Sequence, residues 1–312
     1  MSAARRIASL LASGTEIVCA LGLREALVGI SHECDFPPDV RSLPVLTAPR
    51  LDPRAPSSEI DRAVRDRLAS GLSLYEIHLD RLREITPDLI VTQDQCLVCA
   101  VSLEQVQAEV AGLLGSDARI VSLRPRTLGE ALDDVGRVAE AAGVAARGRE
   151  VRAALRQRLD LLASRANCSA GHKERRPEVL CLEWLDPPIL SGNWMAEIVQ
   201  AAGGGNIGAG AGDPSPRVEW SDVARAAPDV LLLLPCGFDL ERTLAESPAV
   251  LARPQVRDTP AFRSGQVWAL DGNAYFNRSG PRLVDSAEIL AAILHPETFG
   301  DPPAAAARRL PT

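Results

Sequence analysis

One pattern occurs twice in this sequence, and it constrains the fold more than any other feature. In each half, an apolar segment is followed by a helix-like segment that contains Glu-Ile-Val and ends at a glycine, and later by Pro-Asp and a second apolar run. The first copy occupies residues 7–22 and 87–91, and the second occupies residues 179–203 and 228–234. Runs that are apolar on both faces and joined by helices are typical of parallel strands. We therefore expect two Rossmann-like α/β lobes with parallel sheets and a ligand cleft between them.

The length and the helical periodicity divide the chain further. At 312 residues it exceeds the usual size of a single core. Residues 144–166 repeat apolar side chains at helical spacing, which predicts a rigid rod on the order of 33 Å long that joins the lobes. We predict an N-terminal lobe over 1–126, a helical linker over 127–166, a C-terminal lobe over 167–300 and a loosely ordered Pro/Ala tail over 301–312.

Local signals place several elements of the first lobe. Strands are expected at 6–11, 26–31, 44–47 and 89–92, and helices at 59–69 and 79–85. Ser13 and Glu16 have the spacing of a capping box, which predicts that the first helix begins at Ser13.

Charge and hydropathy exclude several classes of function. A net charge of -7 and a pI near 5.3 disfavour binding to nucleic acid or to acidic membranes. No segment approaches the roughly 20 apolar residues of a membrane span. No secretory signal follows Met1, and seven cysteines, an odd number, do not suggest a disulfide framework. We expect a monomer that is cytoplasmic as the sequence is written, or periplasmic if the true start lies upstream.

The loops that follow the expected strands hold the candidate binding residues, because ligands of open parallel sheets bind beyond the carboxyl ends of the strands. The candidates are Ser13, Thr15, His32, Glu33, Phe36, Gln93, Glu183, Trp184, Asn193, Trp194, Cys236, Phe238, Asn273, Tyr275, Phe276, Arg278 and Arg282. Aromatic residues make up only 4% of the chain, yet six of them fall in these loops. This enrichment favours a large ligand with a flat or macrocyclic body. The alternative is that these aromatic rings simply fill space between the lobes.

Thiols and an imidazole in the same loops raise the question of a metal. His32, Cys34, Cys96 and Cys99 have side chains that bind zinc, iron or cobalt. The Cys-x-x-Cys pair has no second matched pair, so direct coordination, redox chemistry and quiet packing all remain open. His32 is either an axial ligand to a metal complex or a hydrogen-bonded loop histidine. The sequence contains no nucleophile elbow and no evident Ser/His/Asp set.

Four segments resemble a known family. Residues 9–17 are close to the opening Ser-Leu-x-Pro-Ser-x-Thr-Glu pattern of the helical-backbone substrate-binding proteins of ABC importers, and residues 31–37, 86–90 and 227–231 also match. The chain is most similar to the branch that binds cobalamin and iron complexes. The resemblance implies two lobes joined by a rigid helix, with ligand bound between them, and an ABC permease as partner if the protein is exported.

The residues and the resemblance together predict non-enzymatic binding of a corrinoid or another metal complex, with no cofactor required. His32 is the candidate to face the metal. The second hypothesis is a cytoplasmic metal- or thiol-dependent enzyme on the same scaffold, with metal bound at Cys96 and Cys99.

Overall fold

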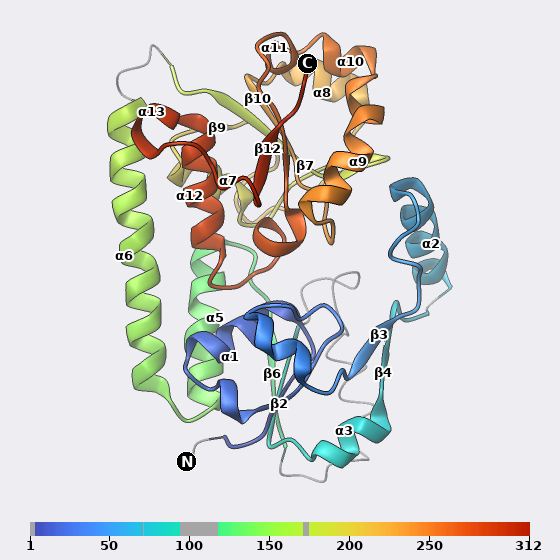
Figure 1. Ribbon diagram of the computed structural model, residues 1–312, viewed down its shortest axis with the longest axis vertical. Coiled ribbons are helices and arrows are strands. Elements are labelled where there is room, and N and C mark those ends of the chain that lie inside the picture. The colour runs from blue at the N-terminus through green and yellow to red at the C-terminus, as the bar shows by residue number, and fades with distance from the viewer. Residues whose placement is uncertain (1–3, 71, 94–117, 171–174) are drawn as a thin grey trace. The chain divides into compact units, whose positions relative to one another are not determined.

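The computed structural model describes residues 4–70, 72–93, 118–170 and 175–312 (Figure 1). The chain forms two compact units. Unit 1 contains residues 1–125 and 129–154, and unit 2 contains residues 126–128 and 155–312. The division falls within a long helix, α6 (Ala145–Ala170), where the sequence predicts a helix over 144–166. Unit 2 therefore begins earlier in the chain than the predicted boundary at residue 167.

Unit 1 is built on a four-stranded parallel sheet with the order β2-β1-β5-β6. The strands are β1 (Ile7–Ser9), β2 (Leu27–Ile30), β5 (Leu89–Gln93) and β6 (Arg119–Leu123). Every residue of the central strands β1 and β5 is buried, so both strands are covered on both faces, as is typical of parallel strands. The predicted parallel arrangement is correct for this sheet.

The helices of unit 1 follow most of the predicted positions. They are α1 (Ala12–Ala20), α2 (Ser57–Ala69), α3 (Leu79–Ile85), α5 (Leu128–Ala141) and the short 3-10 turns at Arg24–Ala26 and Pro38–Ser42. The predicted capping box is wrong, because α1 begins at Ala12 and its N-cap is Leu11, without a side-chain cap. A Cβ on Gly14 would lie 2.8 Å from Val91 Cγ1. This glycine therefore lets the first turn of α1 approach β5 closely.

The predicted strand at 44–47 is also wrong. Val45 forms only an isolated parallel bridge with Ile30, and Pro44 has no N–H to continue a ladder. The chain then leaves the main sheet and forms a separate antiparallel pair, β3 (Thr47–Pro49) with β4 (Tyr75–Ile77). Helix α2 lies between these two strands in the sequence.

Unit 2 is built on a mixed sheet with the order β12-β11-β10-β7-β8, and β9 pairs with β7. The strands are β7 (Glu178–Leu185), β8 (Pro188–Leu190), β9 (Gly205–Asn206), β10 (Val230–Leu233), β11 (Val267–Leu270) and β12 (Ala307–Arg309). The central strands are parallel, but β8 and β12 pair antiparallel with their neighbours. The predicted parallel arrangement is correct for the central strands, and β8 and β12 extend this sheet with antiparallel pairs that the sequence did not indicate.

The two antiparallel strands, β8 and β12, lie in segments that the sequence predicts to be irregular. Residues 183–188, expected to be a loop, are the end of β7 and its hairpin turn into β8. The tail after residue 300, expected to be loosely ordered, contains β12, which pairs with β11. Ala306 and Leu310 bury their side chains there, at 0% and 5% exposed. Burial of apolar groups and pairing with an edge strand together hold this end of the chain in place.

Helices cover the sheet of unit 2. They are α7 (Met195–Ala201), α8 (Trp220–Ala226), α9 (Leu240–Leu251), α10 (Pro254–Arg257), α11 (Pro260–Arg263), α12 (Leu283–Leu294) and α13 (Pro296–Phe299), with a π-helical turn at Gly272–Phe276. Helix α12 buries ten of its residues and packs against α7. Within the described ranges, no helix combines the length and apolar character that a bilayer crossing demands.

Candidate functional site

The polar residues at the strand ends of unit 1 are largely buried. Ser13 and Thr15 lie in the first turns of α1, and Gln93 ends β5; they are 4%, 0% and 6% exposed. Thr15 Oγ1 lies 3.0 Å from the sulfur of Cys34, which is itself buried. Gln93 Nε2 has no hydrogen-bond partner within the described part of the chain. The structure thus brings Thr15 and Cys34 together as a buried polar contact.

His32 follows β2 and is held by a hydroxyl network. Thr47 Oγ1 donates to Ser31 Oγ at 3.1 Å and lies 2.7 Å from His32 Nδ1. Because the single proton of the Thr47 hydroxyl goes to Ser31, Thr47 accepts from Nδ1–H. This tautomer leaves a lone pair on His32 Nε2.

The surroundings of His32 keep its ring neutral. Burial, with a smaller contribution from the charge of His78, lowers the pKa of His32 to about 4. Its side chain nevertheless retains 21% exposure, and Nε2 lies 4.0 Å from Glu33 Oε1. The Tyr75 ring lies 5.5 Å from the imidazole, centroid to centroid. A neutral, oriented and partly accessible imidazole can act as a metal ligand or as a hydrogen-bond acceptor.

Tyr75 was missed by the sequence reasoning. It begins β4, which belongs to the small antiparallel pair, so a search along the ends of parallel strands does not reach it. Phe36, by contrast, was predicted and is 42% exposed. His32, Glu33 and Tyr75 thus form a partly accessible group in unit 1, and Phe36 is a further exposed ring in the same loop as His32.

In unit 2, hydrogen bonds join the segments that follow the three central strands. Cys236 N donates to Glu183 O at 2.9 Å, and Asn273 N donates to Phe238 O at 2.9 Å. Asn277 Nδ2 donates to Leu234 O at 2.8 Å. The backbone is packed so closely here that a Cβ on Gly272 would overlap the carbonyl of Pro235. The ends of β7, β10 and β11 therefore form one connected surface, as the sequence predicts.

Three of the predicted aromatic contacts pack inside this unit instead. Phe276 and Phe238 are 0% and 2% exposed, and Trp194 is 9% exposed, with its Nε1 donating to Phe276 O at 2.9 Å. A ring without exposed surface cannot form the wall of a binding site. The prediction is therefore corrected for these three side chains, which stabilise the loops from within.

Like Tyr275, Trp184 is a half-buried aromatic side chain of this surface. Its Nε1 donates to Asp186 O at 3.2 Å, and its ring meets Phe238 edge-on at 5.3 Å between centroids. The guanidinium of Arg242 lies 3.7 Å from the centroid of Phe238. Arg242 was not predicted, because it lies inside α9 and not in a strand-end loop.

The predicted polar contacts of unit 2 occupy defined positions. Arg278 and Arg282 are 7% and 9% exposed; Arg278 Nη2 donates to Asn273 Oδ1 at 3.1 Å, and Arg282 lies 5.4 Å from the ring centroid of Tyr275. Asn193 adopts a left-handed conformation (φ 53°), and its N–H donates to Asp213 O at 2.7 Å. Nothing in these contacts identifies a bound group.

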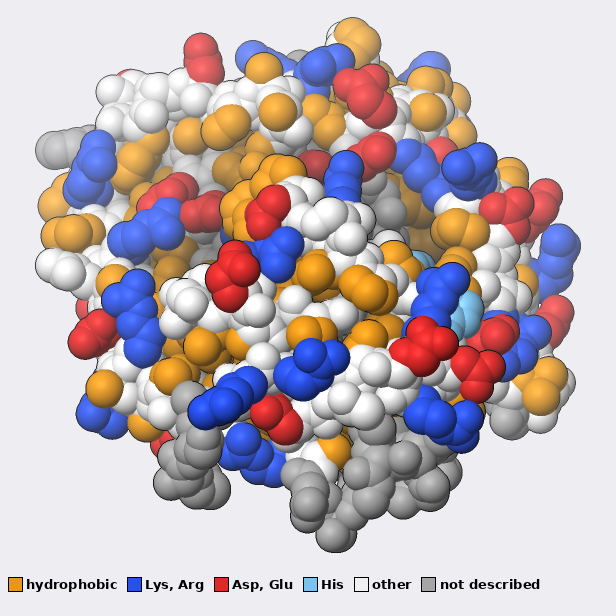
Figure 2. Space-filling view, turned by 60° about the horizontal axis from the view of Figure 1, so that its bottom comes forward, with side chains coloured by type: hydrophobic (Ala, Val, Ile, Leu, Met, Phe, Trp, Pro, Cys, Tyr) orange, Lys and Arg blue, Asp and Glu red, His pale blue; other side chains and the backbone are white. Residues whose placement is uncertain are grey.

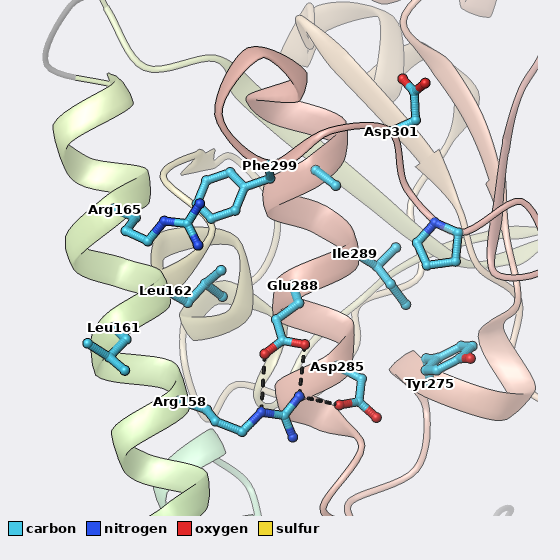
Figure 3. Close-up of a pocket in the computed structure, with 12 residues that line it drawn as sticks. Arg158, Leu161, Leu162, Arg165, Tyr275, Asp285, Glu288, Ile289, Phe299 and Asp301 are labelled. Carbon is cyan, nitrogen blue, oxygen red and sulfur yellow. Dashed lines mark hydrogen bonds and ion pairs between the residues drawn. The ribbon is translucent and has the colours of Figure 1, made fainter.

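A separate cavity of about 630 Å³ lies among α6, α12 and α13 of unit 2 (Figure 3). Leu161, Leu162 and Phe299 form part of its wall, together with Tyr275, which the sequence also predicted as a binding residue. Arg158 crosses it and donates to Asp285 Oδ1 at 2.7 Å and to Glu288 Oε2 at 2.8 Å. These ion pairs attach α6 to α12, so the charges in this cavity are used within the protein.

No group of three metal-binding side chains occurs within the ranges that the structure describes. Cys96 and Cys99 lie outside those ranges, so the predicted metal at this pair stays a prediction. Cys236 is half-buried and Cys34 is buried, and neither forms a disulfide with another described cysteine. Of the predicted metal-binding residues that are described, only His32 has the partly exposed, neutral character of a ligand.

Comparison with known proteins identifies the class. The chain belongs to the periplasmic binding protein family, whose sequence pattern matches residues 7–274. The solved structure of an ABC transporter substrate-binding protein from Listeria monocytogenes shares the fold, with a TM-score of 0.66, 16% identity and coverage of 93% of this chain and 98% of the other. The predicted family and the predicted two-lobe α/β class are thereby confirmed.

Individual relatives narrow the comparison. A vitamin B12-binding protein of Vibrio cholerae is 25% identical over 294 residues, which cover 93% of this chain and 89% of the relative. A vitamin B12-binding protein of Photorhabdus laumondii is 25% identical over 293 residues, 93% and 88% of the two chains. Among solved structures, a periplasmic heme-binding protein of Roseiflexus is 25% identical, with a TM-score of 0.67 over 93% of this chain and 98% of the other. A periplasmic heme-binding protein of Pseudomonas aeruginosa shares the fold, with a TM-score of 0.71, 19% identity and coverage of 99% and 96%.

Proposed function

We propose that this protein binds a corrinoid such as cobalamin, without catalysis, and delivers it to an ABC permease. The vitamin B12-binding relatives support this ligand over most of the chain. Delivery to a permease would place the protein outside the cytoplasmic membrane, where the importers of this family take up their ligands. The observation that carries the proposal is the state of His32.

His32 offers what a metal-bearing ligand needs from a protein. Metal ligation requires a neutral imidazole, and the lowered pKa of His32, about 4, keeps the ring neutral at pH 7. The hydrogen bond from Nδ1 to Thr47 fixes the ring orientation and increases the basicity of Nε2, as outer-shell partners of metal ligands do. Nε2 would then bind the ligand's cobalt, or accept a hydrogen bond from one of its amides.

The accessible aromatic side chains suit the body of such a ligand. Phe36 and Tyr75 in unit 1 and Trp184 in unit 2 are exposed or half-buried, and flat apolar surfaces pack well against a macrocycle. Glu33, Glu183, Asn193 and Asn273 would supply hydrogen bonds to its amide side chains. Ser13, Thr15 and Gln93 would contribute mainly by fixing the loops, because their side chains are buried.

Heme is the second candidate ligand. The heme-binding protein of Roseiflexus is as similar in sequence, at 25% identity, as the vitamin B12-binding relatives. A neutral histidine beside a tyrosine is also a reasonable partner for heme iron. Both candidates share a planar, metal-bearing macrocycle, and titration distinguishes them.

The experiment is a spectroscopic titration of the purified protein with aquocobalamin, cyanocobalamin and hemin. If His32 binds cobalt, aquocobalamin should bind more tightly than cyanocobalamin, whose upper axial position is occupied by cyanide, and its visible spectrum should shift. The substitution His32→Gln should remove that difference. Affinity should be constant from pH 8 to about 5 and fall toward pH 4, because a proton then competes for Nε2.

Three outcomes contradict parts of the proposal. Binding of hemin alone would favour the second candidate, and no binding of any of the three ligands would exclude a metal-macrocycle function. Equal binding of both cobalamins by wild type and His32→Gln would exclude His32 as the metal ligand. Elemental analysis of the untreated protein, compared with Cys96→Ser and Cys99→Ser, tests the separate prediction of metal at that pair.

A further inference from the structure

We propose that Arg242 is a positioning residue for ligand binding: it supports the ring of Phe238, which in turn fixes the indole of Trp184 against which ligand packs. This inference rests on the proposed function and adds a residue to it. Arg242 would control affinity without itself contacting the ligand.

The three side chains form a continuous stack. The Arg242 guanidinium lies 3.7 Å from the Phe238 centroid, closer than the arginine–ring contacts at Arg165, Arg253 and Arg282, which measure 4.6, 4.7 and 5.4 Å. Phe238 also meets Trp184, at 5.3 Å between centroids and with an angle of 61° between the rings. Edge-to-face contact at this distance is a favourable geometry for aromatic pairs.

Phe238 contacts both Arg242 and Trp184, so the loss of the Arg242 side chain can affect Trp184 through this ring. It is 2% exposed, and its backbone is tied on both sides by hydrogen bonds to Pro235 and Asn273. Its ring can therefore respond to the loss of a neighbour mainly by rotating within its pocket. Such a rotation would change the edge on which the indole of Trp184 rests.

Two contacts orient the ring of Trp184. One is the bond from Nε1 to Asp186 O, within the β7–β8 hairpin, and the other is the contact with Phe238. The ring is half-buried, so the rest of its surface is available to a ligand. Without Phe238 in place, one short-range hydrogen bond would define the orientation of a large flat group.

The position of Arg242 in α9 indicates that its side chain has a structural role other than stabilising this helix. Asp239 caps this helix by accepting from Arg242 N at 2.8 Å, which places Arg242 in the first turn. A cation there opposes the helix dipole, which favours anions at the N-terminus. Arg242 also forms an i,i+4 ion pair with Glu246, with 3.7 Å between Nη2 and Oε1. An arginine is nevertheless present, with its planar group over Phe238.

A double-mutant cycle tests this arrangement, with cyanocobalamin and hemin as probes. Arg242→Ala should weaken binding of the probe that wild type binds by roughly tenfold, because binding must then also order the released Trp184 side chain. In a Trp184→Leu background, the same change should alter affinity less than about twofold, because the coupled partner is already gone. Arg242→Lys, which keeps the charge but loses the planar group, should fall between wild type and Arg242→Ala.

A ligand-free readout makes the test independent of the ligand. With fluorotryptophan incorporated, the NMR signal of Trp184, assigned through Trp184→Phe, should shift or broaden in Arg242→Ala. The matched control is Arg225→Ala, which removes an exposed arginine of α8 that pairs with Asp222. It should change neither the Trp184 signal nor the affinity.

The outcomes separate the two proposals. Equal losses of affinity in the wild-type and Trp184→Leu backgrounds would mean that Arg242 acts independently of Trp184 and would overturn the inference. So would an unchanged Trp184 signal in folded Arg242→Ala. If wild type binds neither of these probes nor aquocobalamin, the proposed function fails, and the fluorotryptophan signal alone decides whether Arg242 positions Trp184.

Discussion

Among individual residues, Asp134 has the environment that most opposes its charge. It lies on α5 with its side chain fully buried, and Oδ2 has no hydrogen-bond partner in the described part of the chain. Burial raises its pKa to about 7, although Arg137, which donates to Oδ1 at 2.9 Å, partly offsets this. The folded protein thus holds a proton on Asp134 that the unfolded chain releases near pH 4.

The pH dependence of stability follows from this difference. Between about pH 4 and pH 7 the folded state binds more protons, so the contribution of Asp134 to stability falls as pH rises and stays low above pH 7. Asp134→Asn should therefore increase the free energy of unfolding at pH 8 by about 1–2 kcal/mol relative to its effect at pH 4. Urea unfolding at both pH values measures this. The control is Asp133→Asn, a 43% exposed neighbour paired with Arg152, and a similar pH-dependent gain there would contradict the argument.

The sequence predicted the positions of the candidate site residues more accurately than their exposure to solvent. Phe36, His32 and Trp184 were predicted and retain accessible surface. Phe276 was predicted on the same grounds but is fully buried, because Trp194, 82 residues earlier in the chain, packs there and donates to its carbonyl. Contacts between distant segments decide burial, and no local pattern records them. Tyr75 and Arg242 were missed for the related reason that they come from elements beside the strand ends.

Among elements, the helices were predicted more accurately than the edge strands. The helix at 79–85 was predicted with the observed bounds, and the helix at 59–69 starts two residues earlier, at Ser57. Helical periodicity is local, so the sequence reports it directly. Strands β3 and β12 depend on partners distant in the sequence, and β8 pairs with β7 through a tight hairpin whose turn residues resemble a loop, which is why the predictions at 44–47, 183–188 and 301–312 were wrong.

The attachment of α6 to α12 gives a prediction for a pair of elements. Arg158 makes ion pairs with both Asp285 and Glu288, and its loss would leave two carboxylates close together on one face of α12. Arg158→Gln should lower the free energy of unfolding by about 1 kcal/mol, because the pairs are partly exposed. High salt should shrink the difference. Arg147→Gln, which breaks an exposed pair with Glu150 on the same helix, is the control and should cost less than about 0.5 kcal/mol. Equal effects of the two substitutions in urea unfolding would show that the attachment adds nothing.

For the molecule as a whole, the surface charge agrees with a protein that binds a small ligand and not a polyanion. On the face shown in Figure 2, basic and acidic side chains are interspersed, without an extended region of one sign. The net charge of -7 further disfavours a phosphate-rich partner. The proposed ligand would therefore be recognised by its shape, by aromatic contacts and by a few polar groups.

Binding of the proposed ligand should increase the free energy of unfolding of the whole protein. A ligand that binds the folded state alone raises the free energy of unfolding by about 2.7 kcal/mol when its free concentration is 100 times its dissociation constant. Urea or thermal unfolding should shift accordingly with aquocobalamin, and His32→Gln should shift less at the same concentration because one ligand contact is lost. Cyanocobalamin provides the comparison, since its cobalt has no free upper axial position for His32. If aquocobalamin and cyanocobalamin stabilise wild type and His32→Gln to the same extent, the protein binds the corrinoid through its macrocycle and side chains alone, and His32 serves only to order the loop after β2.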